Sequence, residues 1–259
     1  MGKKLSEMTL EELWQLFPIY LTQHQSYWQE WYLEEESLLK TALSSTEKIN
    51  HIGSTAIPSI WAKPIIDILV EIPKKSNLLD YKALITNSGY ICMSQNENGL
   101  SFNKGYTENG FAERVFHLHL RYSGDNDELY FRDYLIEYPK VAKEYEELKL
   151  RLWKEYEHNR DGYTNAKTTL VKKYTAQAKM IYGNRYWPIY DAEKLFADAE
   201  VLEDVLKHGV GGYLAYDVGE VVDALAEVLG DEVTGEARLE AVLHAVDRVE
   251  GTDEGFVVA

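Results

Sequence analysis

The chain has 259 residues, of which 45% are hydrophobic and 27% charged, a balance that is typical of folded globular proteins and argues against a disordered chain. Its formal net charge of −16 argues against broad nucleic-acid binding, because phosphate contacts need clustered Lys and Arg. With the single cysteine Cys92, no secretory signal and no apolar run near the roughly 20 residues of a membrane helix, the sequence predicts a cytoplasmic protein without an internal disulfide or a membrane partner.

The first predicted elements are two helices followed by two strands. Thr9 and Glu12 form a capping-box pattern that opens a short helix, and apolar residues at helical spacing predict a longer helix over residues 24–43. Short strands are expected at residues 48–52 and 64–72. The second of these consists almost entirely of branched apolar residues, which predicts a strand in the interior of a sheet.

The next elements are a helix, a three-stranded meander and three more helices. A helix over residues 77–87 is expected to end at Gly89, a suitable C-cap. Strands are then predicted at residues 90–95, 100–106 and 114–122, with a turn at 96–99. The remaining helices are predicted at residues 127–138, 139–156 and 163–182. Strands first and helices around them predict an α/β (α+β) domain with a mixed β-sheet flanked by helices.

The composition changes abruptly near Trp187-Pro188. Residues 191–259 hold 8 Asp and 10 Glu against 4 Lys or Arg, so they carry −14 of the net charge of −16. This stretch lacks Ile, Asn, Gln, Ser, Pro, Trp, Met and Cys, whereas all six Trp precede it. Since Pro188 would also end a preceding helix, we place a domain junction there, between residues 1–187 and 188–259.

The second predicted domain is small, acidic and mainly helical. Amphipathic stretches at residues 191–207, 217–229 and 236–249 predict its helices. No stretch has the alternating oxygen ligands of an EF-hand loop, so the acidic surplus indicates solubility or a basic partner rather than calcium. Two origins stay open for this domain: a natural accessory domain, or a segment fused from another source.

The segment that points to chemistry follows the first strand. Gly53 lets backbone amides approach phosphate oxygens closely, and the hydroxyls of Ser54 and Thr55 can add hydrogen bonds. Lys63 can supply a positive charge, and Asp67 on the neighbouring strand is placed to hold a divalent metal that bridges phosphates. A common turn and a strand Asp that accepts backbone hydrogen bonds would give the same pattern, so spacing alone leaves both interpretations open.

The string from His51 to Leu69 resembles the signature of the GrpB family, whose members have a nucleotidyltransferase-like fold. The resemblance covers roughly residues 20–182, because further family motifs recur in order: Phe116-His117-Leu118-His119-Leu120, Phe131-Arg132-Asp133-Tyr134-Leu135, Glu144-Tyr145 with Leu148-Lys149, and Tyr163-Thr164-Asn165-Ala166-Lys167. It implies a nucleotidyltransferase-like domain that takes a nucleoside triphosphate as substrate and a divalent metal as cofactor.

The acidic residues that the resemblance implies are incomplete. Asp67 matches the first acid, whereas Leu69 stands at the second acidic position and Glu71 follows on the same strand face. His117 and His119 also share one strand face, and imidazoles are good ligands for transition metals. We therefore predict a single-metal site of Asp67, His117 and His119 for Mg or Mn, with Zn as an alternative. The competing interpretation is a pair of half-buried, hydrogen-bonded histidines.

The remaining roles also follow from the resemblance. Asp67, Ser54 and His119 are the predicted catalytic residues. The residues predicted to bind the nucleotide are Gly53, Ser54, Thr55, Lys63, Arg132, Lys149 and Lys167. For the last three, the competing interpretation is a solvated helix face with ordinary ion pairs.

Two hypotheses about function remain. The first is a nucleotidyltransferase-like enzyme that binds a nucleoside triphosphate and a divalent metal. The second is a non-catalytic module of the same fold that binds a nucleotide or a phosphorylated metabolite, as Leu69 in the second acidic position permits. In both, the partner is a small molecule and not a nucleic acid.

Overall fold

The computed structural model describes residues 3–43, 47–183 and 185–186. The predicted acidic domain at residues 188–259, with its three expected helices, lies outside the described residues. No helix in the described part is long and apolar enough to cross a membrane.

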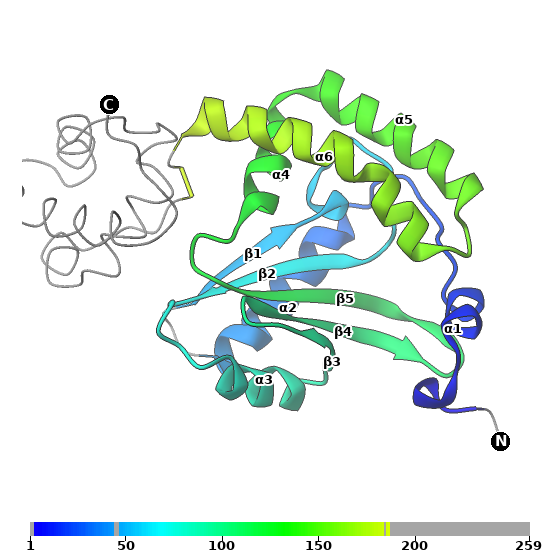
Figure 1. Cartoon of the computed structure of the whole chain (residues 1–259), viewed down its shortest axis with the longest axis vertical. Coiled ribbons are helices and arrows are strands. Elements are labelled where there is room, and N and C mark those ends of the chain that lie inside the picture. The colour runs from blue at the N-terminus through cyan, green and yellow to red at the C-terminus, as the bar shows by residue number, and fades with distance from the viewer. Residues whose placement is uncertain (1–2, 44–46, 184, 187–259) are drawn as a thin grey trace, which may run out of the picture. The chain divides into compact units, whose positions relative to one another are not determined.

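The described part is built on one mixed five-stranded sheet with the strand order β1-β2-β5-β4-β3 (Figure 1). Only the β2–β5 pair is parallel among these neighbours, and the other pairs are antiparallel. The expected mixed sheet with flanking helices is therefore confirmed. The strands are β1 (Lys48–Ile52), β2 (Ile66–Ile72), β3 (Ile91–Gln95), β4 (Gly99–Thr107) and β5 (Gly110–Tyr122).

Strand β2 lies inside the sheet, between β1 and β5, and most of its side chains on both faces are buried. Ile66, Ile68, Val70 and Ile72 point to one face and are fully buried, and Leu69 on the other face is also fully buried. A strand that is buried on both faces needs a nearly continuous run of apolar residues, which β2 has. The predicted interior position is therefore confirmed.

Two helices cover the Ile66 face of the sheet. They are α2 (Tyr27–Ala42), which passes behind the strands in Figure 1, and α3 (Leu78–Asn87), which lies at the lower edge of the sheet in that view. Trp28 and Leu39 of α2 and Ile85 of α3 are fully buried in one cluster with the apolar side chains of β2. Burial of this apolar surface is the main contribution that holds the layers together.

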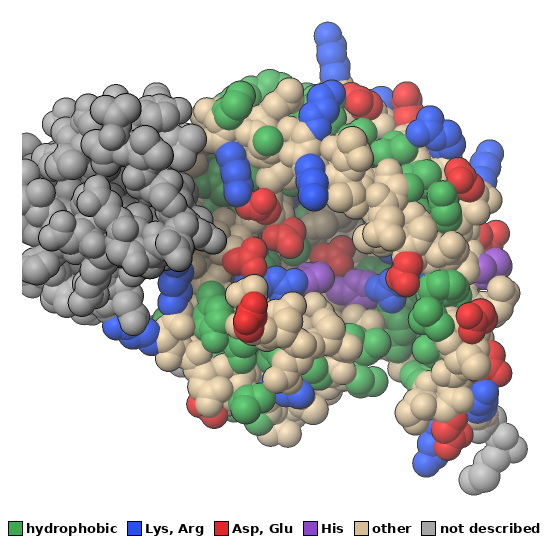
Figure 2. All heavy atoms as spheres, viewed as in Figure 1, with side chains coloured by type: hydrophobic (Ala, Val, Ile, Leu, Met, Phe, Trp, Pro, Cys, Tyr) green, Lys and Arg blue, Asp and Glu red, His purple; other side chains and the backbone are tan. Residues whose placement is uncertain are grey.

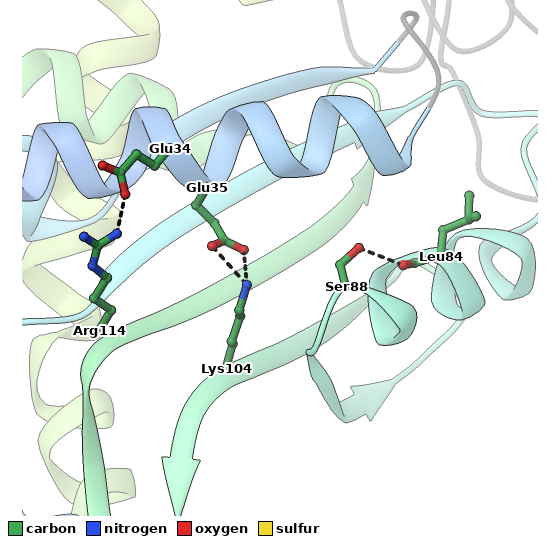
Figure 3. Close-up of polar contacts among 6 residues, drawn as sticks. All are labelled: Glu34, Glu35, Leu84, Ser88, Lys104 and Arg114. Carbon is green, nitrogen blue, oxygen red and sulfur yellow. Dashed lines mark hydrogen bonds and ion pairs between the residues drawn. The ribbon is translucent and has the colours of Figure 1, made fainter.

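Ion pairs also join α2 to the sheet (Figure 3). The Nζ of Lys104 on β4 lies 2.7 Å and 3.0 Å from the two carboxylate oxygens of Glu35, whose side chain is 5% exposed. The neighbouring pair of Arg114 and Glu34 is exposed to 44% and 60%. Only the first pair removes a charge from water, so only it depends strongly on its partner.

The remaining helices lie along the chain as expected, with small shifts at their ends. They are α1 (Leu10–Leu16), α4 (Asp127–Glu137), α5 (Pro139–Glu155) and α6 (Arg160–Tyr182), with short 3₁₀ turns at Leu5–Glu7 and Ser54–Ala56. The predicted capping box is confirmed. The Thr9 hydroxyl accepts a hydrogen bond from the backbone N–H of Glu12 at 3.2 Å, and the Glu12 carboxylate accepts one from the backbone N–H of Thr9 at 2.7 Å. Strand β5 begins four residues earlier than expected, because Thr107 pairs with Gly110 across a tight turn.

Candidate functional site

The parallel register of β2 and β5 brings the predicted acid and imidazoles together. Asp67 pairs with His117 and Leu69 with His119, so these four side chains share the face of the sheet opposite to α2 and α3. Figure 2 shows histidine side chains gathered with acidic and basic ones in a hollow on the face toward the viewer. Asp67 therefore lies next to a histidine of β5, as predicted.

Asp67 and His117 form a hydrogen-bonded pair. The Nδ1 of His117 lies 3.2 Å from Oδ1 of Asp67. Its Nε2 lies 2.8 Å from the hydroxyl of Tyr106 and 3.1 Å from Nη2 of Arg160. Because a guanidinium only donates, Nε2 accepts, which makes His117 a neutral ring that donates from Nδ1 to Asp67. Both ring nitrogens of His117 are thus engaged.

Their surroundings keep the carboxylate charged and the imidazole neutral. Burial would raise the pKa of Asp67, but the hydrogen bond from His117, with His119 and Lys63 nearby, holds it below its ordinary value. Burial lowers the pKa of His117 and outweighs the opposing influence of Asp67. Since the Asp67 side chain is 27% exposed, an ionised carboxylate is accessible from solvent.

Gly53 lies directly against this carboxylate. Its φ of 70° and ψ of −171° belong to a backbone region that is essentially confined to glycine. A Cβ at this position would stand 2.3 Å from Oδ2 of Asp67 and 2.9 Å from its Cβ. The absence of a side chain therefore lets the turn that leads into Ser54 pack onto β2.

Ser54 is held by a lysine from α5. The Nζ of Lys149 donates to the Ser54 hydroxyl at 3.0 Å and also to the carbonyl of Trp61. Lys149 is only 2% exposed. Burial, with Lys167 and Lys63 nearby and Glu146 opposing, lowers the pKa of Lys149 to about 7. A hydroxyl and a buried amine thus stand side by side at the turn.

Two further lysines face the ring of Tyr163. The Nζ of Lys63 lies 5.3 Å from the ring centroid and that of Lys167 lies 4.2 Å from it. Burial, followed by repulsion between neighbouring cations, lowers the pKa of Lys63 to about 7. Burial also lowers the pKa of Lys167 to about 8, with Asp67 opposing the shift. We call Lys63, Lys149 and Lys167 the lysine cluster.

The cluster is arranged for an anion. Lys63 and Lys167 help to lower the pKa of Lys149, and Arg160 helps to lower that of Lys63 and Lys167. Two carboxylates oppose these shifts, Asp67 at Lys63 and Lys167 and Glu146 at Lys149. The buried hydroxyl of Tyr163 has no hydrogen-bond partner among the described residues. Buried cations in excess of nearby carboxylates are stabilised when an anion supplies the missing negative charge.

Two predicted nucleotide-binding residues serve the protein's own structure. The Thr55 hydroxyl donates to the carbonyl of Ile65 at 3.1 Å and lies 3.0 Å from Nε2 of His51. Arg132 binds Asp133 at 2.7 Å and donates to the carbonyl of His51 at 2.8 Å. These contacts favour roles for Thr55 and Arg132 in fixing the end of β1.

The described residues do not form a metal site with three protein ligands. Glu71 accepts hydrogen bonds from the backbone of Gly124 and the side chain of Asn126. His119 is close enough for Asp67 to influence its pKa, which burial lowers to about 4, but within the described ranges no three His, Cys, Asp or Glu side chains are grouped to hold a metal ion. Since both ring nitrogens of His117 form hydrogen bonds, the metal site of Asp67, His117 and His119 stays a prediction.

Tyr106 and Arg160 belong to the site and were not predicted. Lys104 points to α2, and regular alternation would turn Tyr106 to that face as well. The register shifts between Lys104 and Tyr106, where Gly105 has a φ of 89°, and this bulge turns Tyr106 toward His117. Gly105 inside a strand pattern is the sequence signal that could have revealed the bulge.

Comparisons with known proteins agree with the motifs. A family model described as GrpB protein matches residues 18–177. The glutamate-rich protein GrpB of Alkalihalophilus pseudofirmus is 36% identical over 59% of this chain and 91% of its own length. The UPF0157 protein YqkA of Bacillus subtilis is 31% identical over 68% of this chain, which spans only about half, 52%, of that relative. A crystal structure of the conserved protein GrpB from Enterococcus faecalis has 30% sequence identity and a TM-score of 0.54, and the match covers 63% of this chain and 99% of that one.

Proposed function

The chain belongs to the GrpB family, and from this premise we propose that it binds a nucleoside triphosphate, with the phosphates held between the Gly53-Ser54 turn and the lysine cluster. The observation that carries the proposal is the lysine cluster itself: Lys149 is 2% exposed, Lys63 and Lys167 face one tyrosine ring, and Arg160 and the ionised carboxylate of Asp67 lie close enough to influence the pKa of Lys63 and Lys167.

Charge balance supports a ligand with several negative charges. Without an anion, burial and neighbouring cations lower the pKa of each lysine. A triphosphate carries about four negative charges at neutral pH and would raise the pKa of the lysines, which keeps all three in the ammonium form. A monoanion could not compensate the cluster, so a polyphosphate fits it better.

The turn supports the same ligand. At Gly53 the backbone can approach a phosphate without a side chain in between. The Ser54 hydroxyl and the Lys149 amine stand together at 3.0 Å and can both donate to phosphate oxygens.

Nucleotidyl transfer is a second candidate, favoured by the ionised and partly exposed carboxylate of Asp67 beside the turn. A divalent metal such as Mg or Mn would be the implied cofactor, but the described residues do not fit a protein-only site for it. The catalytic roles of Asp67, Ser54 and His119 depend on that cofactor, so binding without turnover is the better supported function.

Titration calorimetry and thermal unfolding with ATP, GTP, CTP and UTP, with and without Mg or Mn, test the proposal on the full chain. A nucleotide at about 100 times its dissociation constant should stabilise the protein by about 2.7 kcal/mol. Lys167→Met should weaken binding by about tenfold or more, because it removes a charged phosphate contact. The control Lys40→Met changes a lysine whose side chain is 59% exposed and should leave binding unchanged. Stabilisation by none of the four nucleotides would contradict the proposal.

The same samples separate the two candidates. If transfer occurs, incubation with a labelled nucleotide, a divalent metal and a hydroxyl-bearing acceptor should move the nucleoside monophosphate to the acceptor oxygen and release pyrophosphate, and Asp67→Asn should abolish the release. If the protein only binds, wild type and Asp67→Asn should both leave the triphosphate intact.

A further inference from the structure

A row of polar side chains lies on the face of the sheet that carries the candidate site. The antiparallel register of β4 and β5 places Asn103 opposite His117, and two residues earlier on β4 it places Ser101 opposite His119. Asn103 and Ser101 flank Phe102, which is buried in one cluster with α2 and α3, so both point to the other face of the sheet. We call Ser101, Asn103 and His119 the neutral row.

The described residues leave the side chains of the neutral row without hydrogen-bond partners. Asn103 is 7% exposed, yet its amide forms no hydrogen bond within the described ranges. The buried Nδ1 of His119 and the hydroxyl of Ser101 have no partner in the same part of the chain. Buried polar groups normally form hydrogen bonds, because leaving them without a partner costs free energy. A ligand that supplies these partners would remove that cost.

The chemistry of the neutral row suits an uncharged ligand group. The amide of Asn103 and the hydroxyl of Ser101 carry no charge, and burial lowers the pKa of His119 to about 4, so its ring is neutral at pH 7. Each of the three groups can both donate and accept a hydrogen bond. Hydroxyl groups of a ligand have the same double capacity. Phosphate oxygens carry negative charge and accept hydrogen bonds, so the lysine cluster suits them better.

The place of the neutral row in the sheet selects the ligand group. Because neighbouring strands lie about 4.8 Å apart, Asn103 on β4 stands about 10 Å from Asp67 on β2, with His117 between them. The neutral row is therefore a neighbour of the Gly53-Ser54 turn, where we place the phosphates. In a nucleoside triphosphate the ribose is bonded directly to the phosphates, and its two hydroxyls are the uncharged polar groups nearest to them.

Resting on the proposed function, we propose that the neutral row is a ribose subsite, in which Asn103 and Ser101 of β4 hydrogen-bond the sugar hydroxyls of the bound nucleotide. His119 completes the row from β5. Since the ribose is common to ATP, GTP, CTP and UTP, the subsite contributes equally to the binding of all four. It distinguishes them from nucleotides that lack the sugar hydroxyls, because the buried polar groups then stay without partners.

The test compares ATP with 2′,3′-dideoxy-ATP by titration calorimetry on the full chain. Both nucleotides carry the same base and the same triphosphate, so a difference in affinity reports the two hydroxyls. Wild type should bind ATP about tenfold more tightly, the ratio that hydrogen bonds of ordinary net strength produce. Asn103→Ala should reduce this preference to about twofold or less and leave the affinity for 2′,3′-dideoxy-ATP unchanged.

The matched control is Asn87→Ala, which removes an amide from α3, on the other face of the sheet. It should keep the full preference for ATP. If Asn103→Ala does not fold, Ser101→Ala decides the outcome, and it should lower the preference by about threefold. Equal affinities in wild type, or a preference that survives in the variants of the neutral row, would overturn the ribose subsite while leaving the phosphate site standing. Binding of neither nucleotide would overturn both.

Discussion

Replacing Gly53 with Ala tests whether the turn and the carboxylate of Asp67 depend on each other. The backbone at φ 70° and ψ −171° costs a residue with a side chain about 1–3 kcal/mol. The new Cβ would also stand 2.3 Å from Oδ2 and 2.9 Å from Cβ of Asp67, so the carboxylate must move. This displacement breaks the hydrogen bond with His117, which is worth about 1.5–3 kcal/mol for a charged group.

Together these costs predict that Gly53→Ala lowers the free energy of unfolding by about 3–5 kcal/mol. Urea denaturation followed by tryptophan fluorescence measures it, since all six Trp lie in residues 1–187. The control is Gly89→Ala, which shares a positive φ of 89° but whose Cβ would meet only Lys104 Cε, at 3.7 Å. It should cost about 1 kcal/mol. Equal losses in the two variants would show that Gly53 is needed only for its backbone and would refute the role assigned to Asp67.

Three further measurements follow from the same contacts. Lys104→Met leaves the buried Glu35 carboxylate without its ion-pair partner and should lower the free energy of unfolding by about 2–4 kcal/mol in the same urea assay. The control Arg114→Met breaks an exposed pair and should change the free energy of unfolding by less than about 1 kcal/mol. Because the lysine cluster releases protons near pH 7–8 when folded and near the ordinary pKa of 10.5 when unfolded, stability without ligand should rise from pH 7 to pH 9. Affinity for ATP should fall over that interval, because phosphate needs protonated lysines, and unfolding and calorimetry at a series of pH values check both signs. Finally, EDTA should leave ATP affinity within about threefold, since lysines rather than a metal neutralise the phosphates; loss of binding on chelation would contradict this.

The sequence predicted the described fold well because its elements follow local rules. The apolar run of β2, the capping box at Thr9 and the meander from residue 90 each depend on patterns within a few residues. The parallel pairing of β2 with β5 does not depend on such local patterns, since it joins Asp67 to His117, fifty residues further along the chain. Local patterns cannot set such a register, and only the family resemblance placed the two residues in one site.

The site was predicted less completely, for physical reasons that particular residues illustrate. A hydroxyl in a turn can bond a side chain of the site, as Ser54 does with Lys149, or a backbone carbonyl, as Thr55 does with Ile65, and neighbouring sequence does not distinguish them. Arg160 was missed because α6 begins at Arg160 and not at residue 163 as predicted. Tyr106 was missed because the bulge at Gly105 reverses the alternation on which its predicted orientation depended.

The absence of a second acid facing the site from β2 and the presence of the lysine cluster have related electrostatic consequences. Leu69 is fully buried beside His119, and Glu71 accepts a hydrogen bond from the backbone N–H of Gly124. Asp67 is therefore the acid of β2 that faces the site. A site that concentrates metal ions needs several carboxylates to offset their charge. The lysine cluster has the opposite requirement, because added cations would repel its amines and an anion relieves the repulsion. The same phosphates can be neutralised by metals or by amines, and the buried charges in this domain favour amines.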